Sequence, residues 1–149
     1  MAKFVYRLQS YLNLKEQVEE LKKNEYGYAL RRLEEERQKK LQLETEQETL
    51  VEIFKNSLLV AIKPADIRRF NNRIELLKVW IVEQEERVKQ AEQEAEEKRL
   101  ALVEAMKDRK ALETVRERNY EDYKLEEKRS EQVVVDGIVS YQYADKMSV

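Results

Sequence analysis

The side chains of this chain that could take part in acid–base chemistry are its carboxylates, because the sequence contains no histidine and no cysteine. They gather in runs such as Glu34–Glu36 and Glu83–Glu86. Catalysis requires groups held in a preorganised, water-excluding pocket. A run of charged residues along a helix normally lies on a face exposed to solvent, where no such pocket exists. We therefore expect no catalytic residue, no metal site, no cofactor and no enzymatic activity.

Other classes of function are disfavoured by charge and hydropathy. A phosphate-binding glycine loop needs clustered glycines, whereas Gly27 and Gly137 lie in opposite halves of the chain. The net charge is −2 and no segment is strongly basic, which argues against binding to nucleic acid. The N-terminal stretch carries Lys3 and Arg7 where a signal peptide needs an apolar core, and no apolar run reaches the roughly 20 residues of a membrane span. We expect a cytoplasmic protein.

The composition indicates long helices. Of 149 residues, 40% are charged, yet the chain has only two glycines and one proline, Pro64. Average usage is roughly 7% Gly and 5% Pro, so a fold with many turns is disfavoured. The chain is rich in Glu, Lys, Arg, Gln and Leu, which is typical of coiled coils.

The segment after Pro64 carries a heptad repeat. With Ile67 at position a, most a and d positions are apolar as far as Leu112, and such a repeat keeps one stripe against a partner helix. Pro64 suits the first turn of this helix, where its missing N–H costs nothing. The a and d positions begin Ile67, Phe70, Ile74, Leu77, Ile81, Gln84, Val88, Ala91, Ala95 and Lys98.

A less regular apolar stripe runs before the proline, and its frame shifts near Gly27. Gly27 is either a tolerated helical glycine or the site of a local bend. The sequence thus predicts one all-α domain over residues 1–149. Its parts are a helix at 3–59, a tip at 60–64, a helix at 65–135 and a tail at 136–149.

The short connection favours an antiparallel coiled-coil hairpin. If the chain folds back at Ile62, three charge blocks meet blocks of opposite sign, and Phe4 meets Tyr120. Flanking charges of this kind select orientation and register more than they add stability. The blocks are Arg37, Lys39 and Lys40 with Glu83, Glu85 and Glu86; Arg31 and Arg32 with Glu92 and Glu94; and Glu16, Glu19 and Glu20 with Lys107, Arg109 and Lys110.

The register leaves the second helix overhanging after Tyr120. Apolar residues such as Val133 and Val134 would then be exposed and available to a partner. Asp136-Gly137 also matches a β-hairpin turn, but an isolated two-stranded hairpin is marginal in water. We expect a helix that weakens at Gly137.

The opening "FVYRLQSYLNLKEQVEELKKNE" resembles the start of the FliJ family, small coiled-coil components of the bacterial flagellar type III export apparatus. The segment "KDRKALETVRERNYEDYKLEEKRSEQ" is similar to the C-terminal half of that family. The resemblance implies an antiparallel hairpin like the central stalk of rotary ATPases. It implies binding to the hexameric export ATPase, to the export-gate protein FlhA and to export chaperones, at the cytoplasmic side of the inner membrane.

The resemblance also implies partner-binding residues. Phe70, Ile74, Leu77 and Ile81 fit the family's spacing for gate contact on the second helix, with Phe54 on the first. The family's terminal end enters the ATPase ring, and there we expect the residues that contact the ring to be Arg7, Arg116, Arg118, Tyr120 and Tyr123.

Two alternatives remain open. The chain could be a scaffold protein that forms a parallel dimeric coiled coil, with Pro64 only kinking a single long helix. It could also be the stalk subunit of a rotary membrane ATPase, although the short connection leaves no room for the sequence that such subunits usually carry between their helices. For the tip, the basic residues Arg68, Arg69 and Arg73 form either a solubilising rim beside Phe70 or a contact for an acidic partner.

Overall fold

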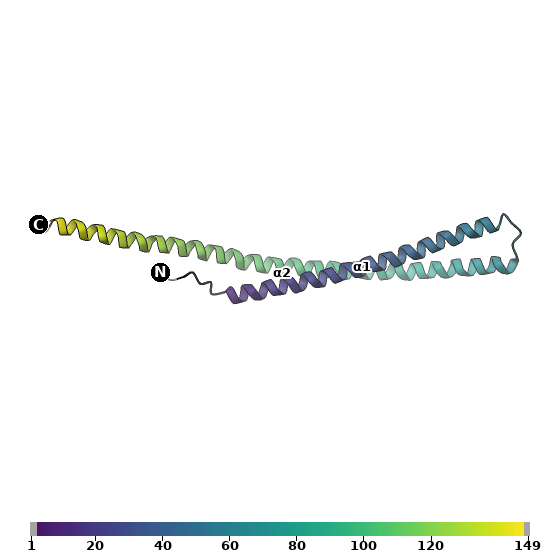
Figure 1. Cartoon of the computed structure of the whole chain (residues 1–149). Coiled ribbons are helices and arrows are strands. Elements are labelled where there is room, and N and C mark those ends of the chain that lie inside the picture. The colour runs from purple at the N-terminus through teal and green to yellow at the C-terminus, as the bar shows by residue number, and fades with distance from the viewer. Residues whose placement is uncertain (1–2, 148–149) are drawn as a thin grey trace. The chain divides into compact units, whose positions relative to one another are not determined.

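The fold consists of two long helices joined by a short loop. The computed structural model describes residues 3–147 and has helix α1 at Gln9–Ser57 and helix α2 at Pro64–Met147 (Figure 1). No strand occurs among these residues. The prediction of an all-α fold is confirmed.

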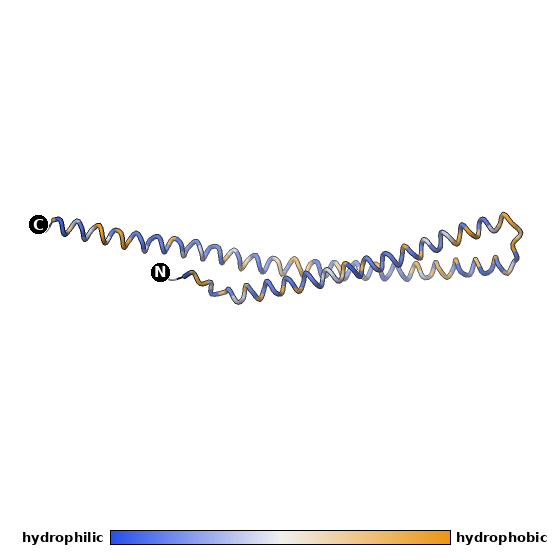
Figure 2. The backbone as a smooth tube through the Cα atoms, in the orientation of Figure 1, coloured by the Kyte–Doolittle hydropathy of each residue, from blue (hydrophilic) through white to orange (hydrophobic). Residues whose placement is uncertain are grey.

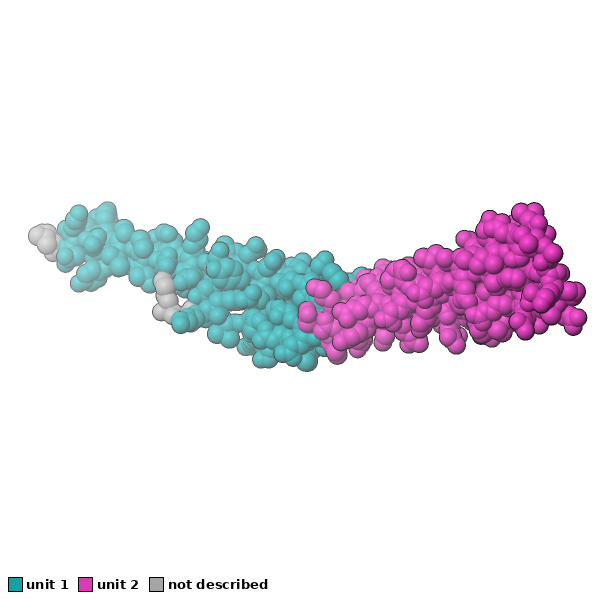
Figure 3. Space-filling model, turned by 45° about the vertical axis from the view of Figure 1, so that its right-hand side comes forward, with its two compact units in different colours: residues 1–19, 104–149 teal, residues 20–103 magenta. Residues whose placement is uncertain are grey.

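The two helices run antiparallel and pack against each other, as the coiled-coil hairpin requires. The chain divides into two compact units, coloured in Figure 3: unit 1 holds residues 1–19 and 104–149, and unit 2 holds residues 20–103. In unit 2 the antiparallel order is seen in ion pairs from Glu46 to Arg73 and from Arg32 to Glu94. In unit 1 the Tyr6 hydroxyl donates a hydrogen bond of 2.9 Å to the carbonyl of Leu112.

The predicted heptad positions face α1. In unit 2, Leu77 is completely buried, and Leu33 forms a small core with Ala91 and Ala95. The alanines remove side-chain bulk from the seam, so little apolar area is buried per turn there. Figure 2 shows the backbone coloured by hydropathy, with hydrophobic and hydrophilic residues alternating along both helices.

Pro64 is the first residue of α2. The carbonyl of Lys63 accepts hydrogen bonds from the N–H groups of Asp66 and Ile67, at 3.0 and 3.2 Å. Residues 58–63 are not helical. The proline therefore opens a second helix, where its lack of an N–H is harmless, and does not kink one continuous helix as the parallel-dimer alternative requires.

The first helix is shorter than predicted. It begins at Gln9 rather than at residue 3, and it ends at Ser57 rather than at residue 59. Phe4 continues the apolar stripe of the first helix, which explains the error at the start, but Tyr6 also contacts α2. Residues two apart cannot share one face of a helix, and an irregular lead-in lets both contact α2.

The predicted tail at 136–149 is helical as far as Met147, and residues 148–149 lie outside the described part of the chain. Helix α2 passes through Gly137 without a positive φ, so the helix does not end at residue 135 as predicted, and the Asp136-Gly137 hairpin turn is not formed. A helical glycine costs only about 1 kcal/mol relative to alanine, which one position in a long helix can absorb.

Candidate partner-binding surfaces

The residues predicted to contact the export gate lie in unit 2, at the loop end of the helix pair. Phe54 of α1 and Phe70 of α2 are in contact, with ring centroids 5.2 Å apart. Ile74 and Ile81 are half-buried, and Leu77 has no exposed surface. These side chains form the seam between α1 and α2, so their assignment to gate contact stays a prediction. It requires the helices to separate locally.

An open groove borders this seam, and the sequence analysis did not find it. It has a volume of about 890 Å³ and is lined by Leu50, Ile53, Val60 and Phe70, with Arg69 and Arg73 among its polar residues. Such a groove arises where the loop draws away from the helix pair. Phe70, at a d position, is one of its lining residues, but the heptad spacing does not predict the groove because its other walls depend on how the loop is placed.

Arg73 is held in position at one side of the groove. Its guanidinium lies 5.1 Å from the ring centroid of Trp80, a cation–π contact, and is 2.5 Å from the carboxylate of Glu46. The interpretation of Arg73 as only a solubilising rim is incomplete, since this arginine ties α2 to α1.

An aromatic cluster occupies the terminal end, in unit 1. The ring centroid of Phe4 lies 5.1 Å from that of Tyr120 and 5.5 Å from that of Tyr123. The Lys124 ammonium lies 4.6 Å from the Tyr120 ring centroid. The predicted meeting of Phe4 with Tyr120 is confirmed.

The structure brings only some of the predicted ATPase-contacting residues together. Arg116 and Tyr120 line one groove of about 520 Å³ with Phe4 and Leu12. Arg7 lies in the irregular lead-in, and Arg118 is exposed on α2. All the residues of α2 from 128 to 147 are exposed, including Val133 and Val134. This exposed C-terminal segment agrees with the predicted overhang.

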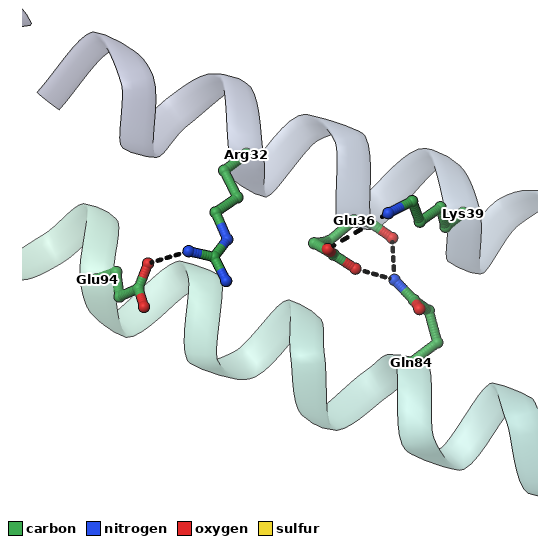
Figure 4. A network of polar contacts seen from close by, with 5 residues as sticks. All are labelled: Arg32, Glu36, Lys39, Gln84 and Glu94. Carbon is green, nitrogen blue, oxygen red and sulfur yellow. Dashed lines mark hydrogen bonds and ion pairs between the residues drawn. The ribbon is translucent and has the colours of Figure 1, made fainter. Parts of the chain in front are cut away.

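A polar network interrupts the seam of unit 2 (Figure 4). Gln84 occupies a d position and is only 4% exposed. Its Nε2 donates to the carbonyl of Glu36 at 2.9 Å and also to the Glu36 carboxylate. The hydrogen bond from Gln84, together with the positive charges of Lys39 and Arg87, lowers the pKa of Glu36 below its ordinary value, against the opposing effect of burial.

The charge blocks meet as predicted in three places. Arg32 pairs with Glu94 at 3.4 Å, Lys40 with Glu85 at 4.0 Å, and Glu19 with Arg109. Other predicted pairings are replaced. Arg37 pairs with Glu92, and Lys39 pairs with Glu36 on its own helix. The register is therefore predicted correctly to within a few residues, while individual partners are not.

Within residues 3–147, no group of three or more histidine, cysteine or acidic side chains is arranged to hold a metal ion. Over the same residues, neither helix is apolar enough along a sufficient length to cross a bilayer.

Taken together, the antiparallel pair of helices, the heptad seam and the exposed terminal segment define a two-helix coiled-coil protein. The family described as Flagellar FliJ protein matches residues 4–148, and the chain belongs to this FliJ family. It is thus a component of the flagellar export apparatus, in a family of structural export components. No curated protein and no solved structure matches the chain.

Proposed function

We propose that the chain is a central-stalk-like component that binds the hexameric export ATPase at its terminal end and couples it to the export gate. The terminal end supports this role best. There an aromatic cluster of Phe4, Tyr120 and Tyr123 closes the helix pair, and α2 continues beyond it with its side chains exposed. Exposed apolar and aromatic groups on one helix suit insertion into a partner.

Arginine side chains would supply the polar part of the ATPase contact. Arg7, Arg116 and Arg118 are exposed in unit 1. Arg116 lines a groove with Phe4 and Tyr120, and Arg7 and Arg118 lie close to these two residues in the sequence. A guanidinium can donate several hydrogen bonds to carboxylates of a partner, and contacts of this kind control association rate and orientation. The acidic side chains of an ATPase ring are the expected acceptors.

The stalk proposal is tested by binding to the cognate export ATPase and by the rate of ATP hydrolysis. We expect the full chain to bind the ATPase and to stimulate hydrolysis. Because a charge-assisted hydrogen bond would be lost and a repulsive charge added, Arg118→Glu should weaken binding at least about five-fold. The matched control is Lys89→Glu, a charge reversal at another exposed residue, in unit 2, which should leave binding unchanged.

Two results would reject the stalk proposal. One is the absence of both binding and stimulation with the unmodified chain. The other is an equal loss for Arg118→Glu and Lys89→Glu, since that would reflect net charge and not a contact at the terminal end.

The gate contact is the second half of the proposal. We place it at the loop end of unit 2, at Phe54, Phe70, Ile74, Leu77 and Ile81, where FlhA would bind after local separation of the helices. Export chaperones are further proposed partners. Binding through FlhA would hold the protein at the cytoplasmic face of the inner membrane without a membrane span of its own.

A further inference from the structure

The loop between α1 and α2 exposes three consecutive apolar side chains. Leu58, Leu59 and Val60 are 52%, 86% and 71% exposed. We call these three residues the apolar tip; they belong to the apolar loop seen in Figure 2. Because exposure of this kind costs solvation free energy in water, it indicates a surface that is covered by something else in use.

Basic residues lie on both sides of the apolar tip in the sequence. The segment from Lys55 to Arg73 contains five basic side chains and one acidic side chain, Asp66, which gives a charge of +4, whereas the whole chain carries −2. All five basic residues are exposed, and Arg73 among them is ion-paired with Glu46 of α1. They are Lys55, Lys63, Arg68, Arg69 and Arg73.

The backbone N–H groups of the apolar tip are already hydrogen-bonded. The N–H groups of Leu58, Leu59 and Val60 donate to the carbonyls of Phe54, Asn56 and Ser57, at 3.1, 3.2 and 3.2 Å. An unpaired N–H group is costly outside water, and these three would enter an apolar phase without that cost.

We propose that the apolar tip inserts into the interface of an anionic lipid bilayer, with the surrounding lysines and arginines on the lipid headgroups. Apolar side chains that enter the interface, combined with several basic residues, give reversible binding to anionic lipids. Consecutive side chains in a turn point in different directions. A fluid bilayer accepts them all, whereas a protein partner would need a separate pocket for each.

This contact goes beyond the stalk proposal, in which partners hold the chain at the membrane. The C-terminal segment provides an internal comparison. Val133 and Val134 are about as exposed as the apolar tip, but residues 128–147 carry three basic and three acidic side chains and are neutral overall. Residues 128–147 therefore form an apolar surface that lacks the positive charge needed to bind anionic lipid.

The test is co-sedimentation of the full chain with vesicles of phosphatidylglycerol and phosphatidylethanolamine, compared with vesicles of phosphatidylcholine alone. We expect binding to the anionic vesicles that weakens as salt is added, and at least a ten-fold preference over the neutral ones. The double variant Leu59→Ser with Val60→Ser should lose about ten-fold or more in vesicle binding. Its matched control is Val133→Ser with Val134→Ser, which should bind like the unmodified chain.

A second variant tests the charges. Arg68→Gln with Arg69→Gln should weaken binding to anionic vesicles by about five-fold for each residue. Circular dichroism should show unchanged helix content in every variant, because none of these side chains is buried in the seam.

The proposal is overturned if the chain does not bind anionic vesicles, or if the tip and control variants behave alike. It is also overturned if the tip variants bind vesicles normally and lose binding to the purified export-gate protein, which would assign the tip to a protein partner. The vesicle assay contains neither ATPase nor gate protein, so its outcome is independent of the stalk proposal.

Discussion

At the scale of single residues, the buried amide of Gln84 is the most specific feature of the seam. It occupies a position that a coiled coil normally gives to an apolar side chain, and it donates to both the backbone and the carboxylate of Glu36. A polar residue at such a position selects one register at a cost in stability, because any other register would leave its amide unpaired. We infer that Gln84 fixes the register of unit 2.

Replacing Gln84 by alanine should lower the free energy of unfolding by about 1–3 kcal/mol at neutral pH, since two hydrogen bonds and buried methylene contacts are lost. Urea unfolding at pH 7 measures this loss. The control Gln90→Ala changes an exposed glutamine of the same helix and should stay within about 0.5 kcal/mol of the unmodified chain. Equal losses in the two variants would contradict the role given to Gln84.

The effect of Gln84→Ala should also depend on pH. The pKa of Glu36 is lowered in the folded chain, so the ionised carboxylate contributes stability above the ordinary value of 4.5. That contribution is lost as the pH falls below 4.5 toward the lowered pKa. The difference in stability between Gln84→Ala and the unmodified chain should therefore become smaller when unfolding is repeated at a pH below the lowered pKa of Glu36. If the difference in stability does not change with pH, the stabilising effect of Gln84 does not depend on the charge of Glu36.

At the scale of elements, the sequence predicts the two helices, their direction and most of the seam. Leu77 and Ala91 lie where the heptad puts them, and Arg32 meets Glu94 as the charge blocks require. These features depend on a repeating pattern, and many positions contribute to it. A single error in the pattern therefore does not change the outcome.

The parts that the sequence does not predict depend on single local choices. A lysine such as Lys39 can reach a carboxylate on its own helix or on the facing one, and sequence spacing allows both. The candidate gate residues raise a related difficulty. Apolar residues that pack the seam and apolar residues that bind a partner have the same heptad spacing in the sequence. Burial in the structure is what distinguishes the two kinds, and the complete burial of Leu77 makes it a seam residue.

The last part of α2 gives a prediction about an element. An added Cβ at Gly137 meets nothing within 4 Å, so Gly137→Ala should stabilise the helix locally by about 1 kcal/mol. Hydrogen exchange of the amides in residues 130–147 should slow by roughly five-fold. The control Gly27→Ala also meets no atom within 4 Å and should leave exchange in this segment unchanged. Unaltered exchange in Gly137→Ala would mean that residues around Gly137 are not helical in solution.

At the scale of the whole molecule, a hairpin and a parallel dimer differ in which residues meet. In the hairpin, Arg37 faces Glu92 of the same chain, whereas in a parallel dimer Arg37 would face Arg37 of a second chain. The chain has no native cysteine, so introduced cysteines report on these two arrangements without interference.

A short bismaleimide should link Arg37→Cys to Glu92→Cys within one chain, and denaturing electrophoresis should show a monomer of altered mobility. A flexible linker is needed because an ion pair between long side chains leaves the two Cβ atoms too far apart for a disulfide. The single variant Arg37→Cys is the control and should give no dimer. A linked dimer from this single variant would favour the parallel arrangement.

The same linked protein tests whether the helices must separate for gate binding. If Ile74, Leu77 and Ile81 contact FlhA, the linked form should bind the gate protein much more weakly than the unlinked double variant. Equal binding would assign the contact to residues that are already exposed.

The antiparallel order of the helices also shapes how the chain folds. The contacts that join α1 and its lead-in to α2 are separated by 27 residues for Glu46 and Arg73, by 90 for Glu19 and Arg109, and by 106 for Tyr6 and Leu112. Closing a longer loop costs more entropy, so pairing should start beside the loop and proceed toward the termini like a zipper. The terminal aromatic cluster is then the last contact to form and the first to fray. The end of the molecule that we assign to the ATPase is thus the end that opens most readily on its own.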